Sequence, residues 1–214
     1  IRTRNDRPSI NTPSSHSETT NFTTSFLITS ALTYTPVFNV TTSSYGVSSS
    51  ARSTSNTHTL AYRPPGKPYR FSYTLDTGTR SSSGSSSSSS FKITRNKYEA
   101  GYNPSPAWDF STNLEKEKDS SSAGAADAYN VDTLNLRLRH IPNKRHTHWL
   151  SLNRISRGGT QTNSRDVLEL GLDYKLTDVF RWDLSFKRSK YNDGDNRDLS
   201  YDGNIIESSL RVEF

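Results

Sequence analysis

Three histidines and two basic residues stand close together in the second half of the chain. His140, His146 and His148 flank Lys144 and Arg145. Such a group could bind a metal ion or a nucleic acid, but no carboxylate lies within the run and the spacing matches no zinc-binding pattern. We therefore interpret the group as a solvated turn, with docking of a partner protein as the alternative. We expect no metal, no cofactor and no nucleic-acid partner.

Paired carboxylates are the second feature that could do chemistry. Asp109 and Glu115 could act as the acid and base of a hydrolase. The surrounding sequence is rich in acidic residues, however, and no histidine or serine nucleophile stands at a matching position. The pair therefore gives no reason to expect catalysis, and we predict that the protein is not an enzyme.

Other charged residues recur at every second position in the last third of the chain. Opposite charges on neighbouring strands can pair across a sheet, so these residues predict a charged face held together by ion pairs. The residues of this predicted ladder are Glu169, Asp173, Lys175, Arg181, Asp183, Lys187, Glu207 and Arg211. Acidic and basic residues on the same face are nearly balanced along the chain. We therefore expect a structural ladder with weak ion selectivity rather than a dedicated substrate path.

The composition limits the elements that could position these residues. Only 30% of the chain is hydrophobic, the net charge is +6, and there are 36 Ser and 24 Thr, while the mean hydropathy is −0.82. These values approach those of a disordered chain, but 11% of the residues are aromatic. The composition excludes an ordinary α/β enzyme, a coiled coil and a helical membrane protein. Without cysteine there is neither a disulfide framework nor a thiolate metal site.

Apolar and polar residues alternate strictly from about residue 21 to the end, which indicates strands with two different faces. The alternation gives about eleven strand-like segments. Phe91 and Ile93 have the opposite parity to Tyr98, and a β-bulge near 94–97 would reconcile them. Between the segments, short turns marked by Pro or Asp alternate with longer polar loops. The expected short turns are 35–37, 63–68, 103–107, 141–147 and 177–179.

Aromatic residues gather beside the short turns, where they would form one girdle. Amphipathic rings favour the boundary between membrane and water. The predicted girdle consists of Tyr34, Tyr62, Tyr69, Tyr102, Trp108, Tyr174, Phe180 and Trp182, and we count Trp149 with them. Together with short turns at one end and long loops at the other, this pattern is typical of a transmembrane β-barrel.

The sequence resembles bacterial outer-membrane β-barrel proteins, and the C-terminus is the strongest local match. Leu210, Val212 and the terminal Phe214 alternate as in the last strand of that superfamily, while Ser209 replaces a frequent glycine. The resemblance implies that the barrel-assembly machinery recognises this strand. It also implies a location in the outer membrane of a Gram-negative-type bacterium, with periplasmic short turns and extracellular long loops.

We therefore expect an all-β, antiparallel up-and-down transmembrane β-barrel over residues 21–214, preceded by a polar extracellular loop or truncated segment over residues 1–20. An odd strand count and the absence of an initial Met lead us to expect the C-terminal part of a larger barrel. The expected function is a pore, or the barrel component of an envelope complex for secretion, lipid export or electron conduction. Membrane lipid, lipopolysaccharide and other envelope proteins are the expected partners. The alternative is a secreted, Ser/Thr-rich surface or adhesive protein.

Overall fold

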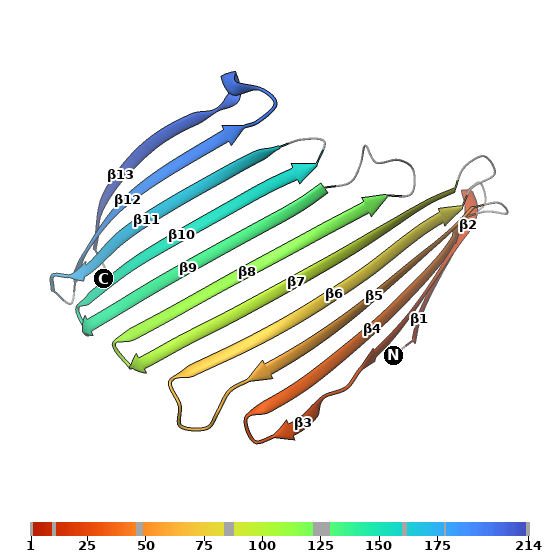
Figure 1. Ribbon diagram of the computed structural model, residues 1–214, viewed down its shortest axis with the longest axis horizontal. Helices are drawn as coiled ribbons and strands as arrows, with labels where there is room; N and C mark the ends of the chain where they lie inside the picture. Colours follow the sequence, from red (N-terminus) through yellow and green to blue (C-terminus); the bar gives the residue numbers. More distant parts are fainter. Residues whose placement is uncertain are drawn as a thin grey trace.

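The computed structural model describes residues 2–9, 12–45, 49–83, 88–121, 129–159, 162–177 and 179–212, which form a single antiparallel sheet (Figure 1). Twelve strands follow one another across the sheet in chain order, and the short β3 pairs with β4 at its edge. The described residues contain no helix long and apolar enough to cross a membrane. The predicted all-β, up-and-down architecture is confirmed.

The strands are long, and most neighbours are joined directly. Their bounds are β1 (Arg2–Ser9), β2 (Thr12–Thr23), β3 (Phe26–Thr29), β4 (Leu32–Tyr45), β5 (Ser49–Tyr62), β6 (Tyr69–Ser83), β7 (Ser88–Ser105), β8 (Trp108–Ser121), β9 (Tyr129–Asn143), β10 (His146–Gly159), β11 (Asn163–Lys175), β12 (Phe180–Asp193) and β13 (Tyr201–Val212). The turn between β5 and β6 shows how the sequence sets these reversals. Gly66 has φ of 69° and the Lys67 N–H donates to the Pro64 carbonyl at 3.3 Å, as a type II turn requires.

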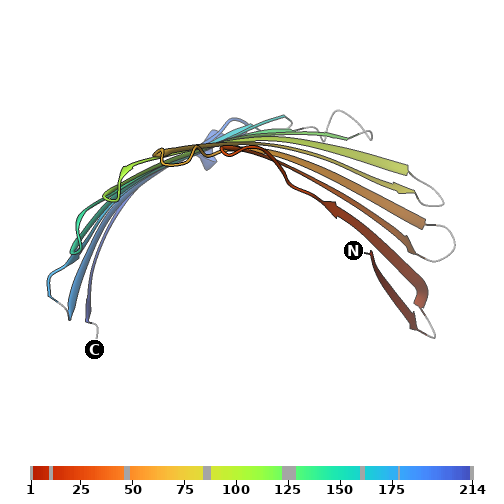
Figure 2. The ribbon, with the colours of Figure 1, turned by 90° about the horizontal axis from the view of Figure 1, so that it is seen from below.

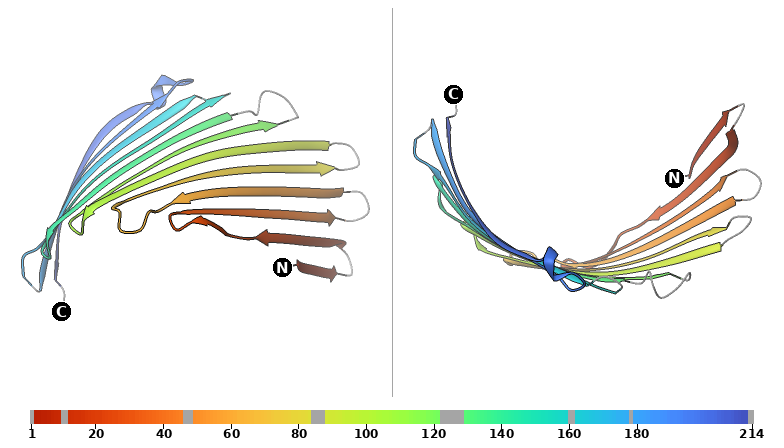
Figure 3. Two further views of the ribbon diagram at one scale, coloured as in Figure 1. Left: turned by 60° about the horizontal axis from the view of Figure 1, so that its bottom comes forward. Right: turned by 90° about the horizontal axis from the view of Figure 1, so that it is seen from above.

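The sheet is one layer, bent into an arc (Figures 2 and 3). No second layer covers either face of the described strands, and no large apolar side chain among them is buried. Instead, many large apolar residues are exposed by 37 to 73%, and the others are half-buried. A water-soluble domain buries such residues in a core between layers. The apolar face of this sheet is therefore unsuited to contact with water.

From β9 to β12 the register aligns the apolar residues of neighbouring strands on one face. Leu138, Leu150, Leu170 and Phe186 stand directly opposite one another on successive strands, and their sequence neighbours lie on the other face. Side chains on the polar face are more crowded than those on the apolar face, which identifies the polar face as the concave one. The Asp173 side chain is 21% exposed, whereas the adjacent Leu172 is 43% exposed.

The N-terminal segment differs from our prediction. Of the two alternatives for residues 1–20, a polar loop or a truncated segment, the loop is wrong, because the described residues there form β1 and most of β2. Their pairing adds one strand to the eleven expected. Both faces of this hairpin are polar in sequence, so hydrophobic alternation could not reveal it, whereas backbone pairing does not need apolar side chains.

The predicted turn at 35–37 is also wrong, since the chain turns at Ser30 and Ala31 and Pro36 lies within β4. Proline has no N–H to donate to the ladder. Its carbonyl accepts a bond from the Thr24 N–H at 3.4 Å, and the partner strand is interrupted there between β2 and β3. Because the register is the same on both sides of the gap, Pro36 breaks the neighbouring strand rather than its own.

The predicted bulge at 94–97 does not form. The pairing of β7 with β6 and β8 is regular through this stretch, so Phe91 and Ile93 lie on the polar, concave face. Several strands also continue into stretches that we expected to be loops, as at Ser82 and Ser89, whose hydroxyls lie 2.8 Å apart. Hydroxyl residues pair across strands as well as apolar ones do, but they leave no alternation in the sequence.

Candidate functional site

The outer, convex face carries an apolar belt whose upper boundary steps regularly from β6 to β12. The last apolar residue before the polar end of the strand is Leu75 on β6, Leu114 on β8, Leu152 on β10 and Phe186 on β12. In the hydrogen-bonded register, each lies two residues nearer the short turns than the one before. The boundary thus shifts by two residues along the strands for every two strands crossed, which corresponds to strands tilted by about 35° from the normal of the belt.

The lower boundary of the belt follows the same steps. Tyr69, Trp108, His146 and Phe180 begin the apolar runs of the same four strands. Each run therefore covers about seven residues, or roughly 20 Å when projected at that tilt, close to the apolar height of outer-membrane barrels. Two parallel boundaries at a constant separation are what a flat membrane slab requires of a tilted sheet.

The eight residues of the predicted girdle all lie on this outer face near the short turns. Tyr69 stands opposite Tyr102 and Tyr174 opposite Trp182, and the Tyr62 and Tyr69 ring centroids lie 6.4 Å apart. The Trp182 indole N–H donates to the Ser208 hydroxyl at 2.9 Å. The rings thus form contacts along one edge of the belt, which fits amphipathic anchors at a water boundary.

The histidines belong to the belt, in contrast to our interpretation of them as a solvated turn. Only Lys144 and Arg145 occupy the turn, while His140 and His148 face each other across β9 and β10 on the outer face. The His140 ring stacks on Trp108, with centroids 3.8 Å apart. The parity of these histidines, shared with Leu138 and Leu150, was the sequence signal for this position.

Trp149 has the opposite parity and is not part of the girdle. It lies on the concave face, where its indole covers Gly171 so closely that a Cβ there would clash with the ring. Arg70 covers Gly101 in the same way, with its guanidinium 2.6 Å from a Cβ built on that glycine. Each glycine thus makes room for a large side chain from the neighbouring strand, which the sequence alone did not indicate.

Ion pairs cross the concave face diagonally between β11, β12 and β13. In the register Asp173 stands opposite Asp183, and Lys175 opposite Arg181. Like charges directly opposite each other destabilise a sheet. Instead, Arg181 donates from Nε to the Asp173 carboxylate at 2.8 Å and Arg211 pairs with Asp183 at 3.2 Å. The diagonal pairs offset the repulsion.

The other members of the predicted ladder lie on the same face. Glu169 stands opposite Lys187 on the neighbouring strand, and Glu207 stands opposite Ser185. All eight ladder residues thus share the concave face, in agreement with their common parity.

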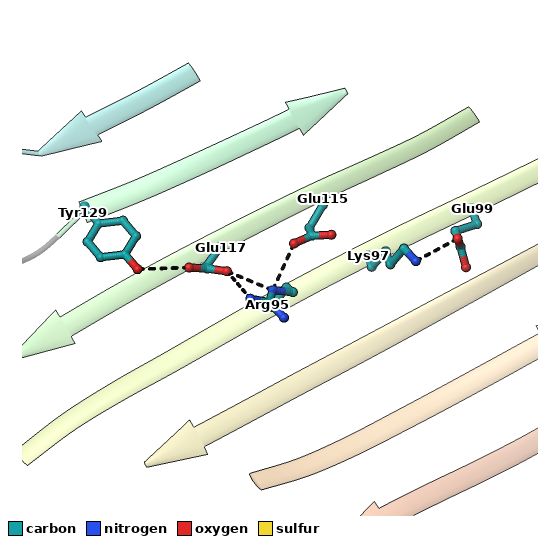
Figure 4. A network of polar contacts seen from close by, with 6 residues as sticks. All are labelled: Arg95, Lys97, Glu99, Glu115, Glu117 and Tyr129. Carbon is teal, nitrogen blue, oxygen red and sulfur yellow. Dashed lines mark hydrogen bonds and ion pairs between the residues drawn. The ribbon is translucent and has the colours of Figure 1, made fainter. Parts of the chain in front are cut away.

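A second charged network joins β7 and β8 (Figure 4). Arg95 donates from Nε to Glu117 at 2.9 Å and pairs with Glu115 at 3.0 Å, while the Tyr129 hydroxyl donates to Glu117 at 3.1 Å. Asp109 lies on the same strand as Glu115, about 20 Å away along it. The two carboxylates considered for hydrolysis are therefore not brought together.

A hollow of about 790 Å³ opens near the short turns and is lined chiefly by concave-face residues. Its polar lining includes Arg70, Glu99, Asn113, Asn135 and Arg137. Both signs of charge and neutral amides occur there, so the wall can hold water and hydrated solutes of either charge.

The acidic segment after β12 uses its carboxylate for its own turn. The Asp193 carboxylate accepts backbone N–H bonds from Asn196 and Asp195, each at 2.9 Å, and these bonds lower the pKa of Asp193. Within the described ranges, no three His, Asp or Glu side chains are grouped as ligands for a metal ion.

The predicted C-terminal signal is only partly within the described residues. Leu210 and Val212 lie on the outer face of β13, opposite Trp182 and Phe180. Phe214 lies outside the described residues, as does Glu213.

No family model matches the sequence, and no curated protein matches it either. Among solved structures, the ferric yersiniabactin uptake receptor FyuA from Yersinia pestis matches with a TM-score of 0.57 and 12% identity; the match covers 93% of this chain and 41% of FyuA. The β domain of the Bordetella autotransporter BrkA matches 94% of the chain and 91% of that domain, at 12% identity and a TM-score of 0.42. The translocator domain of autotransporter NalP from Neisseria meningitidis matches all of the chain and 85% of that domain, at 12% identity and a TM-score of 0.33.

The last two superpositions are too loose to carry an argument, and the first concerns the fold alone. The chain spans less than half the length of FyuA. Its tilted apolar belt, its charged concave face and its single-layer meander agree with that likeness. The chain has the fold of an outer-membrane β-barrel protein.

Proposed function

We propose that this chain forms the membrane-spanning wall of an outer-membrane β-barrel that serves as a pore or as the barrel component of a larger envelope complex. Secretion, lipid export and electron conduction are the kinds of complex that need such a barrel. One observation carries the proposal. An uncovered apolar belt of constant height backs directly onto a concave face of paired charges, so a single layer of strands separates lipid from water.

The physical mechanism follows from the two faces. The convex belt lies in the acyl chains, where exposed apolar area of this extent is favourable rather than a liability. The strands satisfy their backbone hydrogen bonds with one another, as a bilayer requires. On the concave side the ion pairs leave little net local charge, so the wall admits hydrated ions and small polar solutes with weak selectivity.

The two edge strands bear on the same proposal. Within the described residues, β1 and β13 each pair on one side only. Free backbone groups are costly in lipid, so we propose that the ring is closed at these edges by strand pairing. We further propose that outer-membrane lipid and lipopolysaccharide surround the barrel, and that the assembly machinery recognises Leu210, Val212 and Phe214.

The test has two stages and uses the full-length protein. A folded barrel should migrate differently on a gel before and after boiling, and it should require detergent to stay in solution. Unchanged mobility together with solubility in plain buffer would refute the barrel and favour the adhesive alternative. Single-channel recording in planar bilayers then separates an open pore, which gives discrete steps, from a barrel filled by another chain.

A further inference from the structure

Two neighbouring strands carry histidine where the lower boundary of the belt elsewhere carries aromatic rings. The steps that lead through Tyr69, Trp108 and Phe180 place His146 at the boundary on β10, and His140 on β9 stands opposite His148. The His146 ring stacks on Tyr174 with centroids 4.2 Å apart, and the His140 ring contacts that of His148 at 5.5 Å. Imidazole fills the place of an aromatic ring and adds N–H groups that can donate hydrogen bonds.

The turn between these strands adds two cations at the same height. Lys144 and Arg145 are exposed there, and within the described residues no carboxylate forms an ion pair with either. Asn143 holds the turn in place, since its carboxamide oxygen accepts the Arg145 N–H at 2.9 Å and lies 2.7 Å from His146 Nδ1. Among the described residues, these two cations therefore have no protein counter-charge.

An apolar hollow lies directly above this group on the outer face. It has a volume of about 480 Å³, and its lining includes His140 and His148 together with Leu138, Leu150, Leu170 and Leu172. A second hollow of about 690 Å³ on the same face shares Leu138 and Leu150 with the first. The two form a continuous apolar depression that begins at the histidines and runs toward the middle of the belt.

We propose that this surface binds a phospholipid with an anionic headgroup in the leaflet that meets the short turns. The phosphate would accept hydrogen bonds from the imidazole, ammonium and guanidinium groups, since such charge-assisted bonds are the strong ones. The acyl chains would fill the depression above. This site rests on the proposed insertion of the belt into a membrane, but it adds a preference that insertion alone does not predict.

Charge complementarity decides the kind of lipid. The turn of β5 and β6, separated from that of β9 and β10 by the β7–β8 turn, also carries two cations, Arg63 and Lys67, but no histidine lies on the outer face beside it at the belt boundary. A belt that simply ended in a girdle would bind every headgroup equally at both turns. The proposal instead predicts that the lipid preference measured beside Trp108 depends on Lys144 and Arg145 and does not depend on Arg63 and Lys67.

Quenching of Trp108 fluorescence by brominated acyl chains tests the proposal. The full-length protein is reconstituted in phosphatidylcholine vesicles that contain an equal fraction of brominated phosphatidylglycerol or brominated phosphatidylcholine, and the Trp108→Phe variant isolates the signal of Trp108. Two cations near the membrane surface should give the anionic lipid at least about a fivefold preference. The preference should fall to about one in Lys144→Gln with Arg145→Gln, and stay unchanged in the matched control Arg63→Gln with Lys67→Gln.

The outcomes separate this site from the proposed function. Equal quenching by both lipids, or a preference retained in the Lys144 and Arg145 double variant, overturns the site while leaving the barrel intact. Absence of quenching by either lipid means that Trp108 does not face acyl chains, which overturns the site and the membrane belt together. Each variant is first checked for the boiling-dependent gel shift, and if the double variant does not fold, the same ratio is measured on the two single variants.

Discussion

A buried positive charge should reveal the tilt of the membrane belt across the sheet. Leu138, Leu170 and Ile206 lie on the outer face in one hydrogen-bonded row, on β9, β11 and β13. If the belt followed the rows, arginine would cost the same at all three positions. If the belt steps across them, as the boundary residues indicate, the three positions lie at different depths.

The depth difference follows from the geometry. Four strand spacings separate Leu138 from Ile206, which at a tilt of about 35° corresponds to about 11 Å along the membrane normal. Leu138 lies near the middle of the belt, and Ile206 lies at its edge. Arginine should cost about 2–4 kcal/mol at Leu138 and about 0–1 kcal/mol at Ile206, with Leu170 between them. A difference of about 2 kcal/mol corresponds to roughly a 30-fold change in the folding equilibrium constant.

The assay is urea-dependent folding into phospholipid vesicles, followed by the gel shift between folded and boiled protein. Alanine variants at the same three positions serve as controls, since they remove the apolar side chain without adding charge. The order Leu138→Arg, Leu170→Arg, Ile206→Arg should run from most to least destabilising after the alanine effects are subtracted. Equal costs along the row would refute the stepped belt, and negligible costs at all three would refute contact with lipid.

Three further predictions concern the concave face and the loop. Arg181→Gln should shift the reversal potential of the pore toward cation selectivity, because the Asp173 carboxylate loses its partner; an unchanged potential in a salt gradient would place this pair away from the ion path. Gly171→Ala should lower the urea midpoint because its Cβ meets the Trp149 ring, and adding Trp149→Ala should restore it, whereas an unrestored midpoint would assign the damage to another contact. Backbone N–H bonds lower the pKa of Asp193, so they stabilise the loop above the carboxyl's unfolded pKa of about 4 and are lost as the pH falls through the folded value. Limited proteolysis should therefore cut the loop faster in Asp193→Ala than in Asp193→Asn at neutral pH, and equal rates would contradict the role of these bonds.

The sequence was sufficient wherever one face of a strand is apolar and the other polar. Alternation of apolar and polar residues placed the strands from β4 onward, the girdle and the charged face, because a side-chain period of two assigns each residue to one face. The same parity assigns His140 and His148 to the outer face. Their residue type predicts a solvated turn, whereas their position in the alternation decides the face.

The sequence was insufficient where pairing does not depend on hydrophobicity. The hairpin of β1 and β2, and the extension of strands into serine-rich stretches, leave no apolar alternation to detect. Pro36 by its residue type predicts a turn, although its missing N–H interrupts the adjacent strand instead of its own. In these places the ladder of backbone hydrogen bonds decides the structure, and every residue except proline carries the same donor and acceptor.

Alternation along each strand, taken by itself, established that this chain has two chemically opposite faces. Only the tertiary structure decided how those faces are aligned from strand to strand. In the observed register like charges stand directly opposite each other, and Asp173 and Arg181 form a diagonal ion pair. The register also joins separate apolar runs into one tilted belt that ends at histidines on β9 and β10. Register depends on pairing between residues distant in the chain, and a local pattern with a period of two fixes the face of a residue but not its height.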